Sequence, residues 1–154
     1  MFEPSLDAWY AWFGVAVTSS VVLGIVLGIP TATPPAAGPV ADAVDDVATS
    51  PYEATETVDV SAREIQLDAR EVSLRTDGGT SHATFAYGPV TPVGNGSLQP
   101  VLRGEPPQTA FEEKSGFVRA VEQAQKRNAT WQPAPEQLVV RRVQWGEFDA
   151  TVVG

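Results

Sequence analysis

The chain has 154 residues, enough for one domain with an additional segment but not for two full domains. It contains no cysteine, which excludes disulfides and thiolate metal sites. The formal net charge of −9 disfavours nucleic acid as a partner, because phosphate binding requires clustered Lys and Arg.

The charge is unevenly distributed along the chain. Residues 1–62 contain eight acidic residues and no Lys or Arg, whereas residues 63–154 contain eleven acidic residues and all ten basic ones. The acidity therefore belongs to the segment that precedes the folded domain. A solvated, self-repelling spacer explains this better than a docking tail does.

A short tail, residues 1–7, precedes an uncharged apolar stretch over residues 8–29. As a helix, these 22 residues would span about 33 Å, close to the roughly 30 Å of bilayer hydrocarbon. Trp9, Tyr10 and Trp12 lie at one end, where aromatic rings favour the headgroup layer. The tail has no basic residue, unlike a cleaved secretory signal. The sequence predicts a retained transmembrane helix, with the lipid bilayer as its partner.

Small residues recur every four positions within this stretch, and they would form one stripe on a helix: Ala16, Ser20, Gly24 and Gly28. Such a stripe allows close approach of a second membrane helix. We expect it to pack against another copy or another membrane protein, although glycine and serine are also common in membrane helices without such a role.

No Lys or Arg flanks the stretch, so the usual orientation signal is missing. Two N-glycosylation sequons, at Asn95 and Asn128, and the short N-terminal tail favour a domain outside the cell. We expect a single-pass protein of the cell membrane whose C-terminal domain is extracellular.

Residues 30–56 are rich in Pro, Ala, Thr and Asp and have no sustained periodicity. They are predicted to form a flexible acidic linker, within which a short helix through residues 41–47 remains an alternative. The soluble domain is predicted over residues 57–154. It begins with alternating apolar residues over 65–69 and 72–74, then a turn at 77–79 and a further strand over 83–87.

The second half of the domain starts with a long Gly- and Pro-rich loop over residues 88–108. Thr109 and Glu112 have capping-box spacing, which predicts one amphipathic helix over 109–127. Two strands over 138–145 and 148–153 are predicted to meet in a type II′ turn at Gly146-Glu147. This order predicts an α+β fold, a small antiparallel sheet with one packed helix.

The sequence contains few residues in patterns typical of catalytic sites. His82 is the only histidine and lies beside Ser81 and near Asp77, but adjacent strand residues point to opposite faces and no nucleophile motif accompanies them. Arg141 and Arg142 are interpreted as two separate exposed arginines. We expect no catalytic, cofactor-binding or metal-binding residues and no enzymatic activity.

Two segments carry a family resemblance, DAWYAWFGVAVTSSVVLGIVLGIP near the start and VVRRVQWGEFDATVVG at the end. With the acidic composition, they resemble a family of uncharacterised haloarchaeal single-pass membrane proteins associated with type IV pilus-like gene clusters. The resemblance implies an accessory or pilin-like component of an archaeal surface or secretion assembly. Two alternatives are a stand-alone anchored binding module for a ligand or cell-wall component and, less favoured, an anchored hydrolase.

Overall fold

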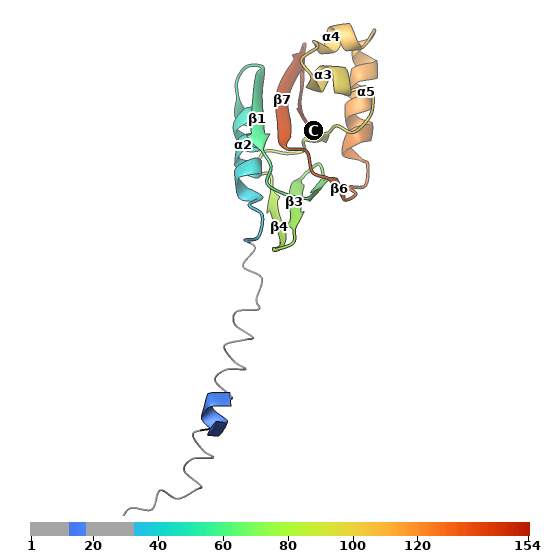
Figure 1. The fold of residues 1–154 in the computed structure, drawn as a ribbon. Coiled ribbons are helices and arrows are strands. Elements are labelled where there is room, and N and C mark those ends of the chain that lie inside the picture. The colour runs from blue at the N-terminus through green and yellow to red at the C-terminus, as the bar shows by residue number, and fades with distance from the viewer. Residues whose placement is uncertain (1–12, 18–32) are drawn as a thin grey trace, which may run out of the picture. The chain divides into compact units, whose positions relative to one another are not determined.

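The computed structural model describes residues 13–17 and 33–154 (Figure 1). The chain divides into two units, Met1–Ala32 and Thr33–Gly154. In the first unit, residues 13–17 form a helical turn with exposed Phe13, Val15 and Val17. No helix within the described ranges has the length and apolar character needed to cross a membrane. The transmembrane prediction for residues 8–29 lies outside the described residues except at 13–17.

The second unit contains two four-stranded sheets and four helices. Its elements in chain order are α2 (Gly38–Thr49), β1 (Ala54–Asp59), β2 (Glu64–Leu67), β3 (Glu71–Thr76), β4 (Gly79–Thr84), β5 (Thr91–Pro92), α3 (Gln99–Leu102), α4 (Pro107–Ala110), α5 (Lys114–Gln125), β6 (Gln132–Pro133), β7 (Gln137–Trp145) and β8 (Phe148–Val153). Sheet A has the order β1-β7-β8-β5, and sheet B has the order β4-β3-β2-β6. The α+β class with antiparallel sheets is confirmed, but the single predicted sheet is two sheets, and β5 pairs with β8 in parallel.

The prediction of a flexible linker over residues 30–56 is wrong from Pro35 onward. Pro35 is buried, α2 follows, and β1 begins at Ala54. The buried side chains of α2 are all Val or Ala and form one stripe along the helix: Val40, Ala41, Ala43, Val44 and Val47. Small apolar residues at these spacings place one continuous face toward a core, which composition alone does not reveal.

The two faces of sheet A are buried against different partners. One face meets α2 and sheet B in the α2 core: Ala37, Val40, Ala41, Val44, Val47, Val60, Ile65, Leu67, Val72, Leu74, Phe85, Val90, Leu138, Val140 and Val153. The other face meets α3 and α5 in the α5 core: Leu98, Val101, Phe117, Val121, Ala124, Val143 and Ala150. The period of two along β7 explains this division, since Leu138 and Val140 face one core and Val143 faces the other.

Both predicted hairpins are confirmed. Thr76 pairs with Gly79 across Asp77-Gly78, and Trp145 pairs with Phe148 across Gly146-Glu147. Gly146 has a φ of 64°, whereas Glu147 does not have a positive φ. A positive φ at the first central position alone is what a type II′ turn requires.

The predicted helix over residues 109–127 is two helices, α4 and α5. Phe111 (φ −128°, ψ 137°) and Glu113 (φ −133°, ψ 144°) are extended and separate them. The extended backbone at Phe111 brings its ring 5.5 Å from that of Phe117 in the α5 core. The capping-box interpretation of Thr109 and Glu112 is therefore wrong, because Glu113 is the N-cap of α5 and makes no side-chain cap hydrogen bond.

Candidate functional site

The structure separates the three residues that a catalytic triad would require. His82 is exposed on β4 and pairs across the sheet with Ser73 of β3, whereas the Ser81 hydroxyl accepts a hydrogen bond from the backbone N–H of Ala37 at 3.5 Å. Asp77 pairs with Arg63, with 2.7 Å between the carboxylate and the guanidinium. Ser81 and His82 thus face opposite sides of sheet B, as the strand geometry predicted.

No group of three or more His, Asp or Glu residues gathers at metal-binding distances in the described parts of the chain. Trp145 packs in the α5 core, where its ring centroid lies 6.1 Å from that of Phe117. Trp131 lies under the guanidinium of Arg75, which is 3.9 Å from the ring centroid. Both tryptophans therefore have contacts within the domain.

Arg141 and Arg142 are structural residues, and the prediction that both are exposed is wrong. Arg141 donates hydrogen bonds to the carbonyl oxygens of Val101 (2.6 Å) and Glu105 (3.2 Å), at the end of α3. Arg142 donates to the carbonyl oxygen of Ala48 at the end of α2 and pairs with Asp149 at 3.0 Å. Adjacent residues on β7 point to opposite faces, so each arginine reaches the negative C-terminal end of a different helix.

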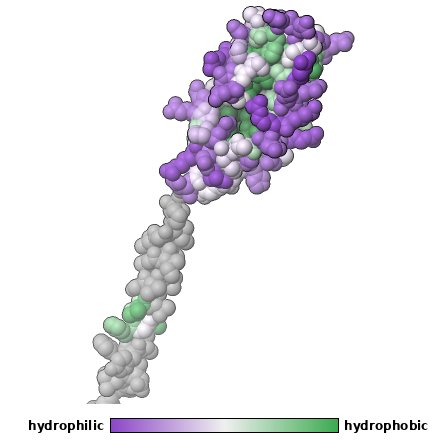
Figure 2. All heavy atoms as spheres, turned by 90° about the vertical axis from the view of Figure 1, so that its right-hand side faces the viewer, coloured by the Kyte–Doolittle hydropathy of each residue, from purple (hydrophilic) through white to green (hydrophobic). Residues whose placement is uncertain are grey.

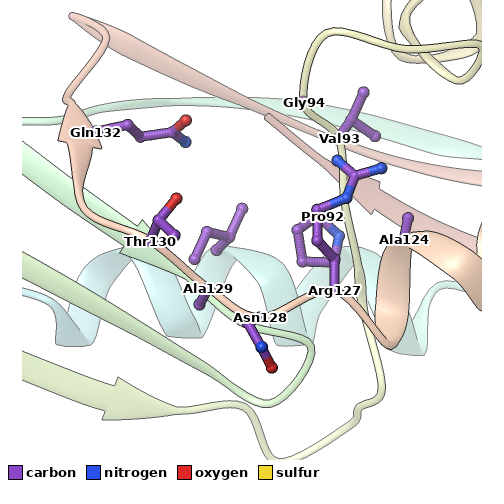
Figure 3. A pocket seen from close by; sticks show the side chains of 10 residues that line it. Pro92, Val93, Gly94, Ala124, Arg127, Asn128, Ala129, Thr130 and Gln132 are labelled. Carbon is purple, nitrogen blue, oxygen red and sulfur yellow. The ribbon is translucent and has the colours of Figure 1, made fainter.

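A candidate site is formed by a pair of adjoining cavities at the C-terminal end of α5 (Figure 3). Their volumes are about 120 Å³ and about 100 Å³. Pro92, Val93, Gly94, Ala124 and Arg127 line both. Each cavity is smaller than the roughly 150 Å³ that accommodates a benzene molecule, so each fits one small functional group rather than a drug-sized ligand.

Arg127 is the only charged residue that lines the two cavities, and neither lining includes an acidic residue. Polar groups complete the linings, among them Thr130 and Gln132 in one cavity and Ser97 and Gln123 in the other. Arg63, Arg75, Lys126 and Arg142 form ion pairs with carboxylates, whereas no carboxylate of the described residues lies within ion-pair distance of Arg127. A guanidinium in this setting is suited to a carboxylate or another oxyanion.

The two sequons border these cavities. Asn128 and Thr130 line the first cavity, and Gly94, Gly96 and Ser97 around Asn95 line the second. Asn95 and Asn128 are both exposed. The sequons mark the two asparagines in the sequence, but no local pattern predicts that they lie near each other.

The other site residues proposed from the sequence belong to the first unit. Ala16 lies in the helical turn over residues 13–17. Ser20, Gly24 and Gly28 of the small-residue stripe, and the interfacial Trp9, Tyr10 and Trp12, lie outside the described residues.

Comparison with known proteins places the chain in a family. A model of a family of unknown function, DUF7283, matches residues 3–143. The chain belongs to this family. No curated protein and no solved structure matches it. The DUF7283 match includes the apolar stretch, α2 and both sequons, and it ends within β7.

Sequence reasoning missed the Arg127 cavities in this DUF7283 member. In the sequence, Arg127 is a cation at the end of a helical pattern and Gly94-Asn95-Gly96 has the composition of a turn, and neither feature indicates a cavity. The cavities form because β5, the end of α5 and the segment before β6 meet there, and these parts are up to 40 positions apart in the chain. The sequence around Arg127 shows only a basic residue with no acidic residue four positions before or after it. This pattern does not predict a cavity.

Proposed function

We propose that this protein is a non-enzymatic, membrane-anchored accessory or pilin-like component of an archaeal surface or secretion assembly. The observation that carries the proposal is the short connection between the apolar stretch and the domain core. The apolar stretch ends at Ile29, and Pro35 is already buried. The five intervening residues reach about 17 Å when fully extended.

A short connection is expected for a subunit of an assembly, whereas a module on a long flexible linker would move freely relative to the membrane. α2 follows the connector directly, and its buried stripe contributes to the α2 core. A displacement of the membrane segment would therefore be transmitted to the folded domain, because the connecting segment is short. A short connector suits a protein whose domain has a defined place in an assembly.

Contacts with neighbours require exposed surface in the domain as well as in the membrane segment. Tyr52, 79% exposed, follows α2 in the chain. Tyr87, 61% exposed, lies beside α2, because its backbone N–H donates to the carboxylate of Asp45 in that helix. Tyrosine is enriched at protein interfaces, where its ring is buried and its hydroxyl keeps a polar partner. We assign the exposed surface at each of these two tyrosines to contacts with other subunits.

The assembly role is tested by cross-linking in native membranes. Gly24→Leu with Gly28→Leu would fill the small-residue stripe and is expected to reduce cross-linked products of the full-length protein at least several-fold. Val22→Leu with Val26→Leu is the matched control, because these positions lie on the opposite side of a helix. Equal yields from both double variants would contradict packing through the stripe.

A stand-alone binding module is the second candidate, and the unpaired Arg127 between two cavities favours it. In this case acetate, added at constant ionic strength, should shift the amide NMR signals of Gly94 and Gly96. Arg127→Gln should abolish these shifts, and Arg119→Gln, at an exposed arginine within α5, should leave them unchanged. Equal shifts in wild type and Arg127→Gln would exclude Arg127 as the anion ligand.

A further inference from the structure

The chain contains only two asparagines, and both stand in complete sequons, Asn95-Gly-Ser97 and Asn128-Ala-Thr130. Ser and Thr make up about one residue in seven of this sequence. Chance would therefore place both asparagines in sequons in about one of fifty chains of this composition. Chance alone thus explains the pattern poorly.

Both sequons are accessible in the folded domain. Asn95, Ser97, Asn128 and Thr130 are all exposed, and both asparagines lie outside helices and strands. Neither side-chain amide makes a hydrogen bond to another described residue. Figure 3 shows the Asn128 amide pointing away from the side chain of Arg127. Both amides are free to react without breaking a contact of the fold.

We infer that Asn95 and Asn128 are N-glycosylated and that the two glycans leave the domain from the same edge. The shared edge follows from the cavities, since Asn128 and the residues on either side of Asn95 line an adjoining pair. Pro92 of β5 also lines both cavities, and β5 is one edge of sheet A. The inference rests on the external domain of the proposed function, because glycan transfer to sequons takes place outside the cytoplasm.

The chemistry is a group transfer from a lipid-linked glycan phosphate. The side-chain amide nitrogen of each asparagine forms a bond to the anomeric carbon of the glycan and gives up one proton. The bond between that carbon and the phosphate oxygen breaks, and the lipid phosphate leaves. No oxidant or reductant takes part.

Glycans at one edge of sheet A would leave its other edge uncovered. β1 lies at the opposite edge of sheet A from β5 and has β7 as its only strand neighbour among the described residues. Tyr52 lies two residues before β1 in the chain. Glycans at Asn95 and Asn128 would cover the β5 edge and the Arg127 cavities, and the β1 edge would remain available for protein contacts.

The test is the intact mass of the full-length protein purified from native membranes, with the protein made in a host that lacks N-glycosylation as the unmodified reference. The native protein is expected to exceed the sequence mass by two glycans. Asn95→Gln and Asn128→Gln should each remove one glycan, and Ser97→Ala should remove the first while keeping its asparagine. Ser97→Thr, which preserves the sequon, should retain both.

A native mass equal to that of the reference protein would overturn the inference. Protease digestion of intact cells separates this result from a failure of the proposed function. A domain that is digested but carries no glycan refutes only the glycosylation, whereas a protected and unmodified domain refutes the external location as well. Glycan loss that does not follow the sequon variants would exclude Asn95 and Asn128 as the attachment sites.

Discussion

α2 and α5 are both twelve-residue helices, and they pack on opposite faces of sheet A. α2 buries only valine and alanine side chains and contains no basic residue. α5 buries Phe117, whose ring contacts those of Phe111, Trp145 and Phe148. The two helices thus bury one side of the sheet with many small contacts and the other with one aromatic cluster.

A segment with the composition of a linker can therefore be part of a core. Pro, Ala and Asp make residues 30–56 resemble a solvated spacer, yet the side chains of α2 that carry the contacts are separated by one, three or four positions. Each valine or alanine buries little area, but together the stripe covers much of one face of sheet A. The domain therefore begins about twenty residues earlier than its composition suggests.

The largest expected effect comes from removing α2. A chain that begins at residue 51 should lose its cooperative unfolding transition, because Ala37 and four residues of α2 make up a third of the α2 core. A chain that begins at residue 33 is the control and should unfold cooperatively. Thermal unfolding followed by circular dichroism distinguishes them, and equal midpoints would show that α2 is dispensable.

On the α5 side, Phe117→Ala should lower the free energy of unfolding by about 3–5 kcal/mol, the usual cost of removing a buried phenylalanine side chain. Phe117 is fully buried at the centre of the aromatic cluster. Arg119→Ala, at an exposed position of the same helix, should change it by less than about 0.5 kcal/mol. Denaturant unfolding measures both, and similar values for the two variants would contradict the packing of α5.

Substitutions of the adjacent β7 residues Arg141 and Arg142 test whether the helices on the two faces of sheet A are stabilised independently. Arg142→Ala should cost about 1.5–3 kcal/mol, the range for hydrogen bonds of charged groups, and should speed amide hydrogen exchange in the last turn of α2. Arg141→Ala should have a similar cost in stability and should speed amide hydrogen exchange at α3, and it should leave the exchange in α2 unchanged. If both variants loosened the same helix, the assignment of the arginines to opposite faces would be wrong.

The smallest expected effect concerns the loop beside α2. The Asp45 carboxylate accepts hydrogen bonds from the backbone N–H groups of Ala86 and Tyr87, both at 3.0 Å. Asp45→Ala should cost about 1 kcal/mol and increase amide exchange at residues 86–87. Asp46→Ala, on the exposed face of α2, should alter neither quantity. A loop that keeps its protection without Asp45 would show that other contacts hold it.

Local patterns predicted the parts of the fold that depend on neighbours in the chain. The two hairpins follow from Asp77-Gly78 and Gly146-Glu147, where glycine permits tight turns between alternating strands. The α+β class follows from those strands and the helical period before Gln125. The break at Phe111 was not predictable in this way, because the ring contact with Phe117 overrides the helical spacing of Thr109 and Glu112.

Features that depend on distant residues escaped prediction. Sheet B joins β2, β3 and β4 to β6, which lies nearly fifty positions beyond β4, and no local pattern encodes that pairing. Arg141 and Arg142 each donate to a backbone carbonyl oxygen at the end of a distant helix, and such acceptors have no sequence signature. The sequence predicted only part of the candidate site. It marks Asn95 and Asn128 but not the cavities of Arg127 between them.

The most direct test of a membrane anchor joined closely to a folded domain is extraction of native membranes with alkaline carbonate, followed by ultracentrifugation. The full-length chain should remain in the membrane pellet, and a chain that begins at residue 33 should be recovered in the supernatant with its cooperative unfolding intact. Recovery of the full-length chain in the supernatant would contradict the account.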